Sequence, residues 1–207
     1  MQRPLPSRDH DLPHDAQTLL AETVTLLEHS SPESLSAEQV AASASLPVES
    51  VDRHFGSFTA LVDRALATRF SRYVDDSITT LAMVLQSATS RDEFRNWLVQ
   101  ITASTQSPDR APRRLERAAA FARAAHSEQF RATLAVEQLR LTHAMLDLIA
   151  GAQGRGWISK ANDPMAVAVM VQAYTLGRVI DDVAAQQMNP DQWVALLVRF
   201  IDHVVMD

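Results

Sequence analysis

The apolar residues near the end of the chain recur with the period of an α-helix. They fall at i, i+3, i+4, i+7, i+8 and i+11, at Trp193, Leu196, Leu197, Phe200, Ile201 and Val204. Composition favours helix elsewhere too, because the 207 residues include many Ala, Leu, Arg, Gln and Glu but only five glycines. We expect an all-α fold in which this stripe packs against a second copy of the chain. Replacing Leu197 and Ile201 by Glu should then give a monomer.

Two short helices joined by a tight turn are expected near the N-terminus. Ser36 and Gln39 have the spacing of a capping box, which begins a helix of residues 36–43, and Pro47 suits the first turn of a helix of residues 47–54. An amphipathic helix precedes them, so residues 14–56 are predicted to form a helix-turn-helix head. Residues 1–13 hold three prolines and no periodic apolar set, and are expected to form a flexible arm.

Residues 57–207 are expected to form a second, helical domain. Ser57 can cap a long helix that runs to about Gln86. Asp163 with Pro164, and Asn189 with Pro190, have the order that begins a helix. The helices expected after the long one are 91–106, 112–126, 128–150, 164–187 and 190–205.

Composition also restricts the location and partners of the chain. Cysteine is absent, which excludes disulfides and thiolate zinc sites. The first residues lack the apolar region of a signal peptide, and the longest nearly apolar run, 165–180, is too short to span a bilayer. We therefore expect a cytoplasmic protein without a membrane partner. The net charge is −6, and residues 1–70 hold five arginines against ten acidic residues, which disfavours tight binding to DNA.

The stretch from Leu35 to Leu61, LSAEQVAASASLPVESVDRHFGSFTAL, resembles the TetR family of bacterial transcription regulators. The matching positions are Val40, Ala41, Ala44, His54, Phe55, Gly56, Ser57, Ala60 and Leu61. The resemblance implies a homodimer whose first three helices bind operator DNA and whose last two helices pack against the partner. It also implies a cavity among the middle helices, where a small apolar or amphipathic ligand changes the distance between the two heads and releases DNA.

Four positions depart from the family pattern. Ser45 stands where the family has a turn glycine, so an unusual φ is expected there. Asp52 replaces a tyrosine that reaches phosphate, while Phe58 and Thr59 replace a Lys-Glu pair whose lysine contacts phosphate. These departures and the acidic charge of the head predict operator binding that is weak or strongly sequence-dependent, with little non-specific binding. Asp52→Tyr with Phe58→Lys should raise the affinity for any duplex.

Seven residues of the head are the candidate DNA contacts. Arg53 and His54 can reach phosphates or base edges, and Ser36 and Ser50 are short hydroxyl donors. The free N–H groups of the helix beginning at Ser57 can hold a phosphate. The alternative is that His54 packs between helices and Ser36 is only a cap. The full set is Ser36, Val48, Glu49, Ser50, Arg53, His54 and Ser57, and the arm adds Arg3 and Arg8.

The middle helices hold aromatic residues and a few polar residues inside apolar stretches. Gln172, Tyr174 and Arg178 interrupt one apolar helix, and a ligand can supply the partners that buried polar groups need. The alternatives are hydrogen bonds within the protein or across a dimer interface, and an ordinary core role for the aromatic residues. The candidate pocket residues are Trp97, Phe121, Met145, Gln172, Tyr174 and Arg178.

No catalytic or metal-binding motif is evident. Residues 10–15, HDLPHD, hold two histidines and two aspartates, but a proline-flanked arm does not supply the fixed geometry that zinc requires. We expect no metal, no cofactor and no enzymatic activity. The first hypothesis is a ligand-responsive repressor. The second is a degenerate relative that acts as a ligand-binding co-regulator without binding operator DNA by itself, and the third is an enzyme that uses the helical pocket.

Overall fold

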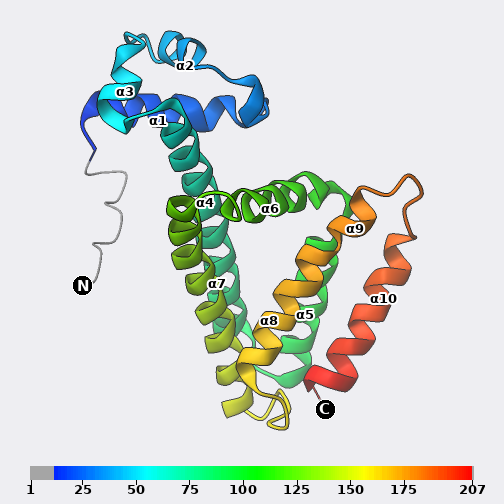
Figure 1. Ribbon diagram of the computed structural model, residues 1–207. Helices are drawn as coiled ribbons and strands as arrows, with labels where there is room; N and C mark the ends of the chain where they lie inside the picture. Colours follow the sequence, from blue (N-terminus) through cyan, green and yellow to red (C-terminus); the bar gives the residue numbers. More distant parts are fainter. Residues whose placement is uncertain (1–11, 207) are drawn as a thin grey trace.

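The computed structural model describes residues 12–206, and within them all regular structure is helical (Figure 1). This confirms the all-α fold. Figure 1 shows a head of three helices at one end of the long helix α4, whose other end lies in a larger body of helices. Most of the expected flexible arm lies outside the described residues, and Leu12 near its end packs against the head core. No helix of residues 12–206 is long and apolar enough to cross a membrane.

The head consists of α1 (His14–Leu26), α2 (Ala37–Ser43) and α3 (Glu49–Phe55), with a 3₁₀ turn, η2 (Pro32–Ser34), after α1. The predicted capping box is present. The Ser36 side chain accepts a hydrogen bond from the Gln39 N–H, and the Gln39 side chain accepts one from the Ser36 N–H. The three helices enclose a small apolar core around the fully buried Leu19, Val40 and Val51.

Two residues with positive φ shape the head. Ser45, in the turn between α2 and α3, has a φ of 54°, which confirms the unusual conformation expected there. Gly56 ends α3 with a φ of 77°, a left-handed conformation that glycine adopts without steric cost. Ser57 then begins α4, because its side chain accepts a hydrogen bond from the Ala60 N–H.

Helix α4 (Phe58–Ser87) belongs to both parts of the molecule. Its first turns contribute Leu61 and Ala65 to the core of the head, and its later turns contribute Val74 and Val84 to the core of the body. The head and the body therefore have separate apolar cores, and α4 contributes buried residues to both.

The body is built from α4 together with six further helices. They are α5 (Arg91–Gln106), α6 (Ala111–Ala124), α7 (Glu128–Gly154), α8 (Pro164–Gly177), α9 (Val179–Asp182) and α10 (Pro190–Phe200). A 3₁₀ turn, η3 (Pro108–Arg110), precedes α6, and a π-helical segment, η4 (Ile201–Met206), follows α10. Phe94, Phe130 and Leu141 are buried at the centre of the body. The bounds of α5 are those expected, and α6 and α7 differ from expectation by a few residues.

The prediction of one continuous helix over residues 164–187 is wrong. Helix α8 ends at Gly177, α9 is a single turn, and residues 183–189 are not helical. Glycine is a poor helix former, and the residues after it are held by another helix. Asp182 accepts two hydrogen bonds from Arg114 of α6, each of 2.7 Å. This long-range contact overrides the helical preference of the local sequence.

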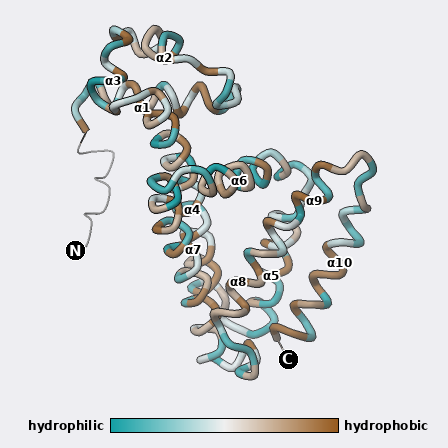
Figure 2. Tube along the Cα trace, viewed as in Figure 1, coloured by the Kyte–Doolittle hydropathy of each residue, from teal (hydrophilic) through white to brown (hydrophobic). Residues whose placement is uncertain are grey.

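The apolar stripe of the last helix divides between two sides. Figure 2 shows apolar residues recurring along α10 between hydrophilic ones. Leu197 and Ile201 are 5% and 4% exposed within the single chain, whereas Leu196 and Val204 are 48% and 42% exposed. The expectation that Glu at 197 and 201 simply gives a monomer is therefore wrong, because it would bury two charges inside the chain itself.

Candidate functional site

Helix α3 turns one side toward the head core and the other toward solvent. Glu49, Asp52 and Arg53 are exposed, as is Val48 just before the helix. Ser50 is only 1% exposed, so its hydroxyl cannot reach a duplex, and its prediction as a DNA contact is wrong. The exposed side of the helix thus carries two carboxylates and one guanidinium.

The remaining candidate contacts of the head also have structural roles. The Ser36 and Ser57 hydroxyls cap α2 and α4, which confirms the alternative role of Ser36. His54 is half-buried, and within the described residues its Nε2 has no hydrogen-bond partner. Phe55 and Phe58 pack against the head core. Contacts of Ser36, His54 and Ser57 with DNA stay predictions.

The head carries enough negative charge to weaken its attraction to DNA. Residues 14–56 contain one arginine, Arg53, and no lysine, but seven acidic residues. Hydrogen bonds from its own backbone and a neighbouring hydroxyl lower the pKa of Glu38, which keeps this carboxylate ionised near the start of α2. Because non-specific affinity for DNA depends on the number of phosphates neutralised, this head attracts a random duplex weakly.

A cavity of about 380 Å³ lies in the body. Its volume is in the range of known small-molecule sites, and most of its lining is apolar. Helices α4 to α8 and the segment 200–205 contribute lining residues. The buried apolar members are Leu81, Phe94, Leu141, Leu148, Ile149, Ile158, Val167, Ile201 and Val205.

Three of the six predicted pocket residues, Met145, Gln172 and Tyr174, line this cavity. The protein itself already satisfies Gln172, because its side-chain carbonyl accepts a hydrogen bond from Gln138 and its amide donates to Thr142 at 3.1 Å. Burial raises the pKa of the Tyr174 phenol, so the group is neutral at physiological pH. These residues give the cavity polar atoms without a net charge.

The other three predicted pocket residues do not line the cavity, and their prediction is wrong. Trp97 and Phe121 pack against the body core, where the ring of Phe121 meets Phe70 edge to face with centroids 6.1 Å apart. Arg178 is 4% exposed and forms an ion pair with Asp181 at 3.1 Å. Core packing thus accounts for the aromatic pair. The ion pair satisfies only part of Arg178, because its buried Nε and Nη1 have no hydrogen-bond partner among the described residues.

Four arginines that the sequence analysis did not select line the α6 side of the cavity. They are Arg110, Arg113, Arg114 and Arg117. Their spacing of i, i+3, i+4 and i+7 puts them on one face of α6 and the turn before it, so the sequence did contain a signal. The lining includes one acidic residue, Asp76.

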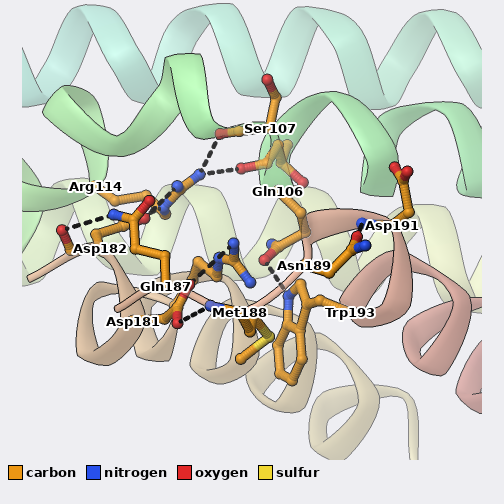
Figure 3. Close-up of polar contacts among 12 residues, drawn as sticks. Gln106, Ser107, Arg114, Asp181, Asp182, Gln187, Met188, Asn189, Asp191 and Trp193 are labelled. Atoms are coloured by element: carbon orange, nitrogen blue, oxygen red, sulfur yellow. Dashed lines mark hydrogen bonds and ion pairs between the residues drawn. The ribbon is translucent and has the colours of Figure 1, made fainter. Parts of the chain in front are cut away.

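Arg114 is held in a buried ion pair (Figure 3). Its Nε and Nη2 donate to the two carboxylate oxygens of Asp182 at 2.7 Å, and both side chains are 3% exposed. Its Nη1 donates to the backbone carbonyls of Thr105 and Ser107. The charge of Arg114 is therefore neutralised within the protein, and α9 is fixed against α6.

A second buried contact fixes the last helix. Trp193 of α10 donates a hydrogen bond from its Nε1 to the side-chain carbonyl of Gln106, which is fully buried in α5 (Figure 3). The distance is 2.8 Å. Trp193 of the predicted interface stripe thus joins two helices of the same chain.

Within residues 12–206, no three His, Cys, Asp or Glu side chains are grouped so that they could hold a metal ion. The HDLPHD segment begins outside these residues, so its first His and Asp have no described position.

Solved structures with the same arrangement of helices define the class of this fold. One, assigned to the TetR family and from Mesorhizobium loti, has a TM-score of 0.67 and 11% identity, with 95% of this chain and 96% of that chain covered. A second structure assigned to the TetR family, from Rhodococcus sp., has a TM-score of 0.63 and 22% identity, with 93% of this chain and 98% of that chain covered. A transcriptional regulator from Saccharomonospora viridis in complex with choline has a TM-score of 0.68 and 15% identity, with 93% and 97% covered. No family model and no curated protein sequence matches this chain. The fold is thus the all-α arrangement of a helix-turn-helix head and a larger helical domain.

Proposed function

We propose that this protein is a ligand-responsive transcriptional regulator, a repressor of the TetR type that works in the cytoplasm and is not an enzyme. The observation that carries the proposal is the continuity of α4. Its first turns pack in the head through Leu61 and Ala65, and its later turns line the cavity through Tyr73, Ser77 and Leu81. A ligand that displaces the cavity end of α4 changes the orientation of α3, and thereby the affinity for an operator.

We further propose that the functional unit is a homodimer formed through α8 and α10. Val169 and Met170 of α8, with Leu196 of α10, are 47% to 52% exposed, and Val204 follows on η4. Exposed apolar residues on adjacent elements are typical of protein interfaces, and a symmetric pair of such surfaces buries both. In this dimer each cavity sets the spacing of the two heads, which must match two half-sites on one face of the duplex.

A mobility-shift experiment at low ionic strength tests DNA binding directly. The probe is the duplex upstream of the gene, and the competitor is a scrambled duplex of equal length. We expect retardation of the upstream duplex only. Arg53→Ala should weaken it, while Arg131→Ala, which changes another exposed arginine, on α7, should not.

The second candidate function is a co-regulator with the same fold that does not bind operator DNA by itself. The acidic surface of the head favours it, since the one arginine of residues 14–56 shares α3 with the exposed Glu49 and Asp52. If neither duplex is retarded at low salt while the chain still forms dimers and binds ligand, the co-regulator replaces the repressor as the preferred function.

A further inference from the structure

The charges that line the cavity are mostly positive. Four arginines face one carboxylate, and the ion pair with Asp182 neutralises only Arg114. Arg110, Arg113 and Arg117 remain, against Asp76. No salt bridge of these three arginines occurs within residues 12–206. An apolar cavity therefore carries an excess of about two positive charges on its α6 side.

Arg117 shows most clearly that this charge lacks a partner. It is 6% exposed, so it has lost most of its hydration. Its Nη1 donates to the Tyr73 hydroxyl at 2.9 Å and its guanidinium lies 4.5 Å from the Tyr73 ring centroid, but its buried Nε has no hydrogen-bond partner among the described residues. A buried cation with a free donor is costly unless an anion accepts that bond.

The same side of the cavity opens to solvent. Arg110 and Arg113 line the cavity yet are exposed, and so is Asp76 on the facing helix α4. The apolar lining continues inward to the buried residues Phe94 on α5, Ile158 in the loop after α7 and Val205 on η4. A ligand that fits this distribution has a charged head near α6 and an apolar tail in the interior.

We propose that the ligand of this cavity is an anionic amphiphile, a single apolar chain with a carboxylate or similarly charged head that is bound by Arg113 and Arg117. This inference rests on the proposed function, because it names the class of ligand that the same cavity binds. Guanidinium groups suit the assignment because they bind carboxylates in two-pronged, charge-assisted hydrogen bonds. The same charges repel a cationic head group.

Calorimetric titration of the whole chain with three decyl compounds, each below its micelle concentration, tests the assignment. Decanoate carries the anionic head, decan-1-ol the neutral head and decyltrimethylammonium the cationic head. We expect decanoate to bind at least about tenfold more tightly than decan-1-ol, the difference that one charge-assisted contact supplies, and the cation to bind most weakly. Equal or tighter binding of the alcohol or of the cation overturns the assignment, and so does the absence of decanoate binding.

Two matched variants separate the head-group contact from general effects. Arg113 is exposed and makes no hydrogen bond or ion pair within residues 12–206, so Arg113→Gln should fold normally. It should weaken decanoate binding by roughly five- to tenfold and leave decan-1-ol binding unchanged. Arg131→Gln removes an exposed arginine outside the cavity and should change neither. Equal losses in the two variants would overturn the assignment.

The experiment contains no DNA, so its outcome is independent of operator binding. If the mobility shift fails but decanoate binds selectively, the repressor is lost and the ligand class stands. If the three decyl compounds bind equally while the upstream duplex is retarded, the ligand class is lost and the proposed regulator stands.

Discussion

The head carries an excess of negative charge, whereas the α6 side of the cavity carries an excess of positive charge. A surface that binds DNA is expected to be basic, and a cavity for an apolar ligand is expected to be uncharged. In the proposed regulator residues 14–56 bind DNA, yet they hold one arginine and seven acidic residues. The cavity is proposed to hold a small apolar or amphipathic molecule, and four arginines line it. The net charge of −6 hides this separation. The position of the charges, rather than their sum, therefore indicates where an anion binds.

The largest expected effect is the loss of stability when the buried ion pair between Arg114 and Asp182 is broken. Arg114→Leu leaves the Asp182 carboxylate buried and unpaired, which should lower the free energy of unfolding by about 3–5 kcal/mol. Denaturant unfolding measures the change. Arg140→Leu is the control, because Arg140 is 43% exposed in its ion pairs with Asp75 and Glu137, each of which should contribute less than about 1 kcal/mol. Similar losses in the two variants would contradict the role given to the buried pair.

The next effect concerns a surface that belongs to the body and not to the head. Val169→Glu with Leu196→Glu places charges on the exposed apolar side of α8 and α10, and should convert a dimer into a folded monomer at micromolar concentration. Sedimentation velocity measures the state, and Met83→Glu is the control at an equally exposed position on α4. If the unmodified chain already sediments as a monomer, the proposed interface does not exist.

A third prediction concerns the charge of the head alone. Glu49→Gln with Asp52→Asn removes two repelling carboxylates per head without touching the core, and should raise the affinity for any duplex. These positions replace the pair Asp52 and Phe58 suggested by the sequence, because Phe58 packs against the head core. Anisotropy of a labelled random duplex measures the affinity. An unchanged affinity would show that the exposed side of α3 does not face DNA.

The smallest effect compares two left-handed residues within the head. Ser45→Gly should stabilise the chain by less than about 1 kcal/mol, because a left-handed serine is strained but glycine is more flexible when unfolded. Gly56→Ala should destabilise it by about 1 kcal/mol through conformation alone, since nothing lies within 4 Å of the added methyl group. The melting temperature gives both signs, and a loss of stability in Ser45→Gly would contradict the strain.

Local sequence signals predicted most of the fold. The capping box at Ser36, the left-handed turn at Ser45 and the caps of Ser57 and Asp163 all depend on contacts within a few residues. The interruption of the expected helix of residues 164–187 was not predicted, because it depends on the contact of Asp182 with Arg114, which lies 68 residues away in the sequence. Long-range ion pairs leave no periodic signal in one sequence.

The candidate site was harder to predict than the fold. Met145 and Tyr174 were placed in the cavity correctly, but Trp97 and Phe121 were not, because an aromatic residue at helical spacing has the same pattern in a core as in a pocket. Ser50 was misjudged because the rotation of a seven-residue helix cannot be fixed from so few apolar positions. The arginines of α6 had a readable spacing and were overlooked.

The salt dependence of DNA binding tests most directly the claim that positive charge is scarce on the head. Anisotropy of the upstream duplex is recorded over a series of potassium chloride concentrations, with Arg3→Gln and Arg8→Gln introduced so that the arm does not contribute. With one arginine per head, the slope of log K against log salt should be about −2 for a dimer, because each neutralised phosphate contributes about −0.9. A slope steeper than roughly −5, together with tight binding of a random duplex, would contradict it.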